Sequence, residues 1–155
     1  MKRLALMALL MAVPALVALA ADEKPVGPDG TYKITALTKG GKKASDEELK
    51  ALESLTIKGD KMTMKIAGVG THTASIKVDA KAKPATIDLI PDEGPDKGET
   101  KPGIWKLEKD VLTIALAEGK DAKRPADFDG KGKDVIVIVL TKDEPKKDEP
   151  KKDDK

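Results

Sequence analysis

The feature that most constrains this chain is a regular alternation of apolar and polar side chains. In residues 31–36, for example, Tyr32, Ile34 and Ala36 alternate with threonine and lysine. Successive side chains of a β-strand point to opposite faces, so this period of two predicts a strand with one buried face. We expect seven further strands, at residues 55–58, 61–66, 71–78, 87–89, 105–107, 112–116 and 135–140.

The last of these segments, 135–140, is apolar on both faces, which predicts a central or closing strand. Residues 45–52 instead have the period of a helix. Ser45 and Glu48 form a capping box, acidic residues fill the first turn, and two leucines share one face. The sequence therefore predicts a helix of about two turns between the first two strands.

Eight short antiparallel strands and one small helix define an all-β domain, which is either a closed barrel or a sandwich. A closed barrel has the advantage that it leaves no exposed strand edges. The interior of an eight-stranded barrel is either filled by side chains or holds one small ligand. The sequence leaves that choice open.

Both ends of the chain are expected to lie outside this domain. Two basic residues, an apolar run over 4–21 and an Ala-x-Ala motif at 18–20 are typical of a secretory signal peptide over 1–20. A retained membrane anchor is the alternative, which Pro14 and the small residues of the motif disfavour. Residues 21–29 are interpreted as a leader. The protein is therefore expected to be exported, either to the periplasm or into the medium.

The C-terminal residues 142–155 repeat the pattern Lys-Asp-Glu-Pro-Lys and contain six acidic and six basic residues. Such a segment cannot bury enough apolar surface to offset the entropy of ordering it. We therefore expect a disordered charged tail at 142–155, which leaves 30–141 as a single β domain.

Charge and composition argue against several functions. Cleavage after residue 20 removes two of the 29 basic residues and no acidic one, which leaves 27 of each sign. A neutral chain has no long-range field to attract nucleic acid or anionic lipid. Without cysteine, the chain has no disulfide, no thiolate nucleophile and no cysteine-based metal site. One Trp, one Tyr and one Phe provide no platform for stacking bases or sugars.

His72, the single histidine, is expected on the inner face of the strand 71–78. It would be a ligand contact or a strand-end residue bonded to backbone or water. It cannot build a zinc site alone, and Ser75 faces the other side of the strand, so no Ser-His-Asp relay follows. The acidic loop 92–99 lacks the spacing of a calcium loop and is expected to be a solvated turn. We predict no enzyme activity, no catalytic residue, no metal site and no cofactor.

A further signal comes from three stretches of the domain, namely 29–34, 85–90 with 94–98, and 103–108 with 112–114, Arg124-Pro125 and Phe128. In this order and spacing they resemble a family of small exported lipocalin-like domains that is abundant in planctomycete bacteria. The resemblance covers residues 30–141. It implies an eight-stranded antiparallel lipocalin-like barrel of unknown function, with no catalytic residues to transfer. Tyr32 departs from the Gly-x-Trp that opens many such barrels, but tyrosine can still plug the barrel base and hydrogen-bond through its hydroxyl.

The leading hypothesis is non-enzymatic binding of a small apolar or amphipathic ligand, or of a partner protein, by a monomeric barrel. The alternative is a structural or interaction protein of the cell envelope with a solid core. No nucleic-acid partner and no membrane span after signal cleavage are expected. Residues 124–128 would form a lid over one barrel end, or be a loop that is simply anchored by its phenylalanine. The candidate ligand-binding residues of the interior and the lid are Tyr32, Met64, His72, Trp105, Arg124 and Phe128.

Overall fold

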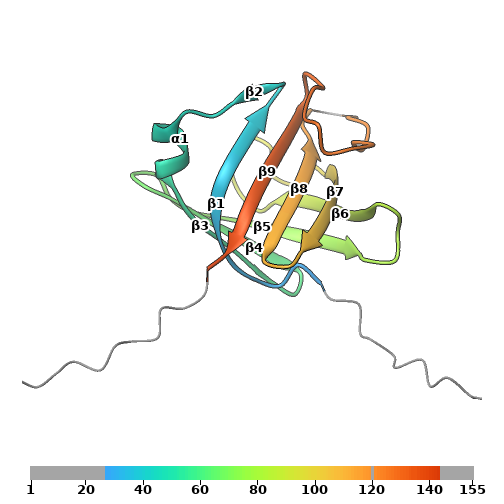
Figure 1. The fold of residues 1–155 in the computed structure, drawn as a ribbon, viewed down its shortest axis with the longest axis horizontal. Helices are drawn as coiled ribbons and strands as arrows, with labels where there is room; N and C mark the ends of the chain where they lie inside the picture. The colour runs from blue at the N-terminus through green and yellow to red at the C-terminus, as the bar shows by residue number, and fades with distance from the viewer. Residues whose placement is uncertain (1–26, 120, 144–155) are drawn as a thin grey trace, which may run out of the picture.

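The computed structural model describes residues 27–119 and 121–143, which form strands and one short helix (Figure 1). The predicted signal peptide, most of the predicted leader and the predicted tail beyond residue 143 lie outside the described residues. The elements are β1 Gly30–Lys39, β2 Lys42–Lys43, α1 Asp46–Ala51, β3 Leu52–Lys58, β4 Lys61–Ile66, β5 Gly70–Asp79, β6 Ala85–Pro91, β7 Lys101–Glu108, β8 Val111–Ala117 and β9 Val135–Lys142.

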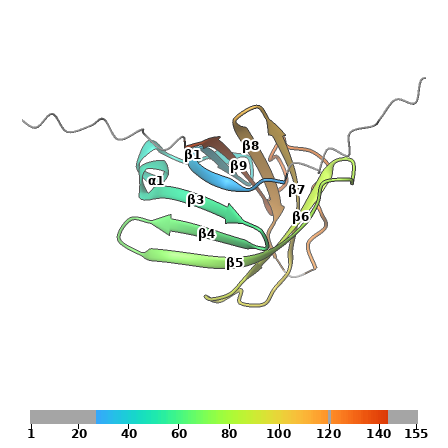
Figure 2. The same cartoon turned by 90° about the horizontal axis from the view of Figure 1, so that it is seen from below.

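The strands close into an eight-stranded antiparallel barrel, which excludes the sandwich. Strands β1 and β3 to β9 pair in that order, and β9 returns to pair with β1. Figures 1 and 2 show β1 and β9 side by side at this closure. The two-residue strand β2, which was not predicted, adds to the edge of β1. The predicted closing role of the last segment and the helix between the first two long strands are both confirmed.

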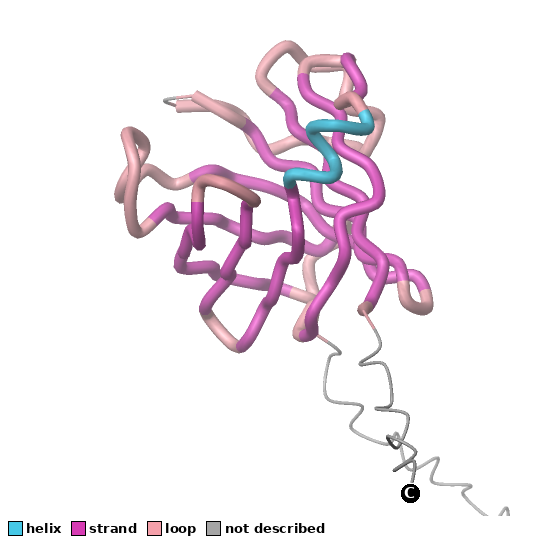
Figure 3. The backbone as a smooth tube through the Cα atoms, turned by 90° about the vertical axis from the view of Figure 1, so that its left-hand side faces the viewer, coloured by secondary structure: helices cyan, strands magenta, loops and turns pink. Residues whose placement is uncertain are grey.

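The two ends of the barrel differ, and we call them the base and the mouth. At the base the chain enters β1 and leaves β9, and the tight β3–β4 and β7–β8 turns lie there. At the mouth lie the β4–β5 turn, the loop 92–100, the loop 118–134 and helix α1 (Figure 3). The strand β9 ends at Lys142, and the amide of Asp143 still donates to the carbonyl of Thr31 at 2.8 Å.

The base is filled by side chains. Tyr32 is 1% exposed, and its hydroxyl donates to the carbonyl of Pro28 at 2.9 Å. This hydrogen bond was expected, because a buried phenol needs a partner. Burial, and secondarily the nearby charge of Asp29, raise the pKa of Tyr32 above its usual value. The other large inward side chains that are almost completely buried are Leu55, Ile57, Ile87, Leu112, Ile114 and Leu140.

One register shift corrects the predicted inner face of β1. The pairing of β1 with β9 is irregular between Ile34 and Ala36. A bulge of one residue exchanges the two faces of the strand beyond it. Ala36, which the alternation predicted to be inward, is therefore exposed, and Leu37 packs against the core in its place.

A second, smaller core lies outside the barrel wall. Ile104, Ala115 and Val137 are neighbours across β7, β8 and β9, and their side chains point away from the interior. Phe128 of the loop 118–134 packs on them, together with Val135. This cover explains why β8 and β9 are apolar on both faces. Each contributes one face to the interior and the other to the loop.

Candidate functional site

The strongest candidate site is an apolar pocket at the mouth, which we call the mouth pocket. Its volume is about 330 Å³, at the lower end of the range of roughly 300 to 1,000 Å³ that is usual for small-molecule pockets. It lies against the inner face of three consecutive strands, β4, β5 and β6. The lining residues are Met62, Met64, Ile66, His72, Thr73, Ala74, Leu89, Pro91 and Glu93.

Strand register explains why these side chains meet. Met64 pairs with His72, and Met62 pairs with Ala74, which in turn pairs with Pro91. Directly paired residues point to the same face of a sheet, so the alternation within each strand places its apolar side chains together. Met62 and Ala74 are 3% and 8% exposed and are the most deeply buried of the lining residues. Met64 and Leu89 are half-buried.

The barrel wall opens at the mouth on the side of β1 and β3. These two strands pair only over three residues near the base, from Gly30 to Tyr32 of β1. Beyond that point they diverge, and α1 contacts both (Figures 2 and 3). The helix begins at a capping box, in which the Ser45 amide donates to Glu48 Oε2 at 2.7 Å and the Glu48 amide donates to Ser45 Oγ at 3.3 Å. These bonds lower the pKa of Glu48 below its usual value.

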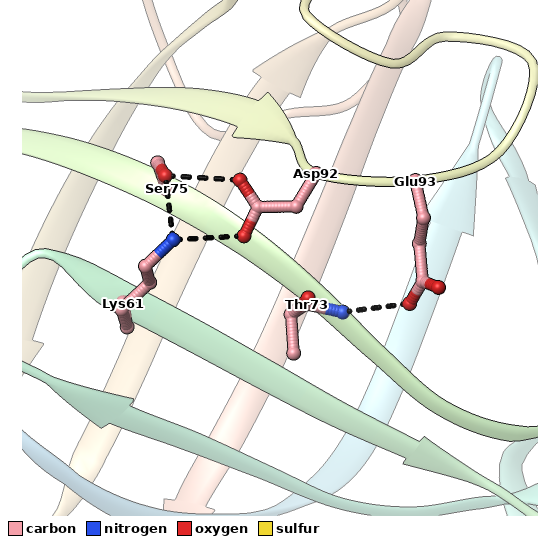
Figure 4. Close-up of polar contacts among 5 residues, drawn as sticks. All are labelled: Lys61, Thr73, Ser75, Asp92 and Glu93. Atoms are coloured by element: carbon pink, nitrogen blue, oxygen red, sulfur yellow. Dashed lines mark hydrogen bonds and ion pairs between the residues drawn. The ribbon is translucent and has the colours of Figure 1, made fainter.

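The polar part of the pocket consists of His72 and Glu93. His72 Nδ1 lies 3.7 Å from Glu93 Oε1, and the two side chains are 46% and 51% exposed. The same carboxylate oxygen accepts a hydrogen bond from the amide of Thr73 at 3.2 Å (Figure 4). The predicted inward register of His72 is therefore consistent with its place in the pocket lining, although the ring remains partly open to solvent.

A three-residue network holds the start of the loop that carries Glu93. Lys61 Nζ donates to Ser75 Oγ and to Asp92 Oδ2, both at 2.9 Å, and Ser75 Oγ donates to Asp92 Oδ1 at 3.0 Å (Figure 4). These bonds lower the pKa of Asp92 below its usual value, and the bond from Lys61 makes the largest contribution. Because Asp92 is fixed in this way, the next residue is held at the pocket rim.

Three carboxylates of the acidic loop after β6 make contacts with other groups of the protein. Asp92 bonds Lys61, Glu93 bonds the backbone of β5, and Asp96 pairs with Lys101 at 2.6 Å. Across residues 27–119 and 121–143, no group of three or more acidic, histidine or cysteine side chains is arranged to hold a metal ion.

Of the six predicted site residues, only Met64 and His72 line the mouth pocket. Tyr32 belongs to the filled base. Trp105 is 4% exposed, and its indole N–H donates to the carbonyl of Thr86 at 3.1 Å. Together with Phe128, it borders a separate, shallow hollow on the base side of the barrel, with a volume of about 580 Å³.

Arg124 and Phe128 do not form a lid over the mouth pocket. Arg124 lies on the outside of the wall, where one guanidinium nitrogen is 2.7 Å from Asp88 Oδ1 and another donates to the carbonyl of Gly103. Phe128 packs on the outer core. Arg124 therefore contacts a carboxylate of the outer wall, and the structure shows the alternative in which Phe128 anchors the loop.

Sequence reasoning missed several lining residues as parts of a site. The apolar ones, Met62, Ile66 and Leu89, were recognised as alternating positions, but nothing in the alternation indicates which end of a barrel stays open. Glu93 was interpreted as part of a solvated turn. Its role depends on the bonds of its neighbour Asp92 to two other strands, which a single sequence does not reveal.

The fold and the pocket define the class of protein, namely a closed eight-stranded antiparallel β-barrel with an apolar pocket at one end. In the part of the chain that the structure describes, no helix is long and apolar enough to cross a membrane. Comparisons with protein-family models, with curated proteins and with solved structures give no match to this chain.

Proposed function

We propose that this chain is an exported, non-enzymatic binding protein, which takes a small apolar or amphipathic molecule into the mouth pocket. The observation that supports this proposal is the pocket itself, with six apolar lining residues on the inner face of β4, β5 and β6. Transfer of an apolar group from water into such a site is favourable by roughly 25 cal/mol per Å² of buried apolar surface. The resemblance to exported lipocalin-like domains remains a prediction that agrees with this proposal.

The lining suits ligands of varied shape. Met62 and Met64 carry flexible, polarisable side chains that adapt to irregular apolar surfaces. The filled base below them limits how deep a ligand can enter, so we expect it to occupy the mouth and to leave one end near solvent.

A structural role in the cell envelope is the second candidate. The observation that favours it is the filled base, where Leu55, Leu112, Ile114 and Leu140 are 0% exposed. On this alternative, the mouth pocket would be an irregularity at the end of a solid barrel.

Native mass spectrometry of residues 21–155, purified from the host, separates the two candidates. A bound molecule that is lost on denaturation would support the binding function. Displacement of an apolar fluorescent probe then locates the site. Ala74→Leu places a large side chain in the pocket, and Thr71→Leu adds the same side chain to the exposed outer face of the same strand.

We expect Ala74→Leu to abolish probe binding and Thr71→Leu to retain it. A protein that carries no ligand and binds no apolar probe in any form would support the structural candidate instead.

A further inference from the structure

We infer that the mouth pocket selects amphipathic cations, that is, molecules with an apolar body and an amine head. This inference rests on the proposed function and adds the chemical class of the ligand. It starts from the charge of the lining. Glu93 is the one formally charged side chain among the lining residues, and the rest are apolar residues, one threonine and His72.

The Glu93 carboxylate is held in place by the backbone. Its Oε1 atom accepts the Thr73 amide at 3.2 Å and lies 3.7 Å from His72 Nδ1. The carboxylate therefore has a defined position beside the apolar lining, while about half of the Glu93 side chain stays exposed to solvent.

The nearby lysines are engaged with other acids. Lys61 lies 2.9 Å from Asp92, and Lys65 lies 2.9 Å from Glu53. Among residues 27–119 and 121–143, the structure gives Glu93 no lysine or arginine ion pair. Within the described barrel, no lysine or arginine side chain thus balances the negative charge at the pocket.

A ligand can supply this missing partner. An ammonium head would donate hydrogen bonds to the Glu93 carboxylate, while its alkyl chain lies between Met62, Met64 and Leu89. A carboxylate head at the same place would be repelled by Glu93. A hydroxyl head has no net charge, so the Glu93 carboxylate would neither attract it as an ion nor repel it. The order expected for matched chains is therefore amine above alcohol above carboxylate.

Three eight-carbon probes test this order, namely octylamine, octanol and octanoate, each competing with an apolar fluorescent dye. At pH 8 and low salt an alkylamine is protonated, as a lysine side chain is, and octanoate is ionised. Because Glu93 is half-exposed, we expect octylamine to bind about fivefold more tightly than octanol. We expect octanoate to bind more weakly than octanol.

Two variants assign the preference to one residue. Glu93→Gln keeps the shape of the side chain, removes its charge and should abolish the preference for octylamine over octanol. Glu99→Gln removes the same charge from the same loop, at an exposed position outside the pocket lining, and should keep the preference.

Equal binding of the three probes, or tighter binding of octanoate, would overturn the cation inference and leave the proposed function standing. So would a preference for octylamine that survives in Glu93→Gln. If none of the three probes binds, the proposed function itself fails.

Discussion

Two leucine-to-alanine substitutions compare the filled base with the open mouth. Leu112 is 0% exposed and pairs with Leu107 and Leu140 inside the barrel. Leu89 is half-buried and lines the mouth pocket. Both substitutions remove the same atoms. Only Leu112→Ala creates a closed cavity, whereas Leu89→Ala enlarges a space that already reaches solvent.

The expected losses follow from this difference. Removal of a fully buried leucine side chain costs about 4 kcal/mol, because a cavity adds to the lost transfer free energy. Leu89 loses only part of the transfer free energy, so Leu89→Ala should cost about 1 kcal/mol. With a urea m-value of about 2 kcal/mol per M, the unfolding midpoints fall by about 2 M and about 0.5 M respectively.

Urea unfolding followed by fluorescence measures both losses. Trp105, the single tryptophan, is 4% exposed and reports directly on the interior. The m-values of the two variants should match that of the unsubstituted protein, so that the shifts reflect stability alone. Equal losses in the two variants would refute the distinction between a filled base and an open mouth.

Three further predictions concern the wall, the helix and acid stability. Gly103→Ala should destabilise the barrel by about 2 kcal/mol in the same assay, because an added Cβ would lie 2.5 Å from the Ala115 carbonyl oxygen. An unchanged urea unfolding midpoint would contradict the close packing of β7 against β8. Ser45→Ala should cost about 1 kcal/mol and raise the pKa of Glu48, which an NMR titration would detect as a midpoint closer to 4.5. The pKa values of Glu48 and Asp92 lie below the ordinary values of 4.5 and 3.8. The stability that these two carboxylates contribute is therefore present above their ordinary pKa values, and it is lost as the pH falls through their lowered pKa values in the folded protein. A urea midpoint that stays constant from pH 6 to pH 2 would contradict this prediction.

Local sequence patterns were sufficient to predict most of the barrel. The alternation identifies strands because it reflects a single physical fact, the opposite orientation of successive side chains. The capping box at Ser45 and the doubly apolar segment 135–140 are equally local signals, and the helix and the closing strand were placed correctly from them.

What was missed depends on contacts between distant parts of the chain. The bulge after Ile34 arises from the pairing of β1 with β9, and no residue within β1 predicts this bulge. The outer core needs Phe128 to reach across three strands. The mouth pocket depends on how far β4, β5 and β6 extend beyond the filled base, and on the network that positions Glu93. The sequence therefore predicted inward side chains, but not the end at which they remain accessible.

The pairing of β1 with β9 has a consequence for how the chain folds. Between these two strands, the Thr35 hydroxyl donates a hydrogen bond to the carbonyl of Val139, which lies 104 positions further along the chain. In the other strand pairs of the barrel, the two strands follow one another along the chain. Each of these strands can therefore add to the strand formed before it. Contacts between such distant residues slow folding, because the entropy of closing a long loop must be lost first. Closure must therefore wait until β9 has been synthesised, and until then β1 and β8 each present an open edge to solvent and to other chains.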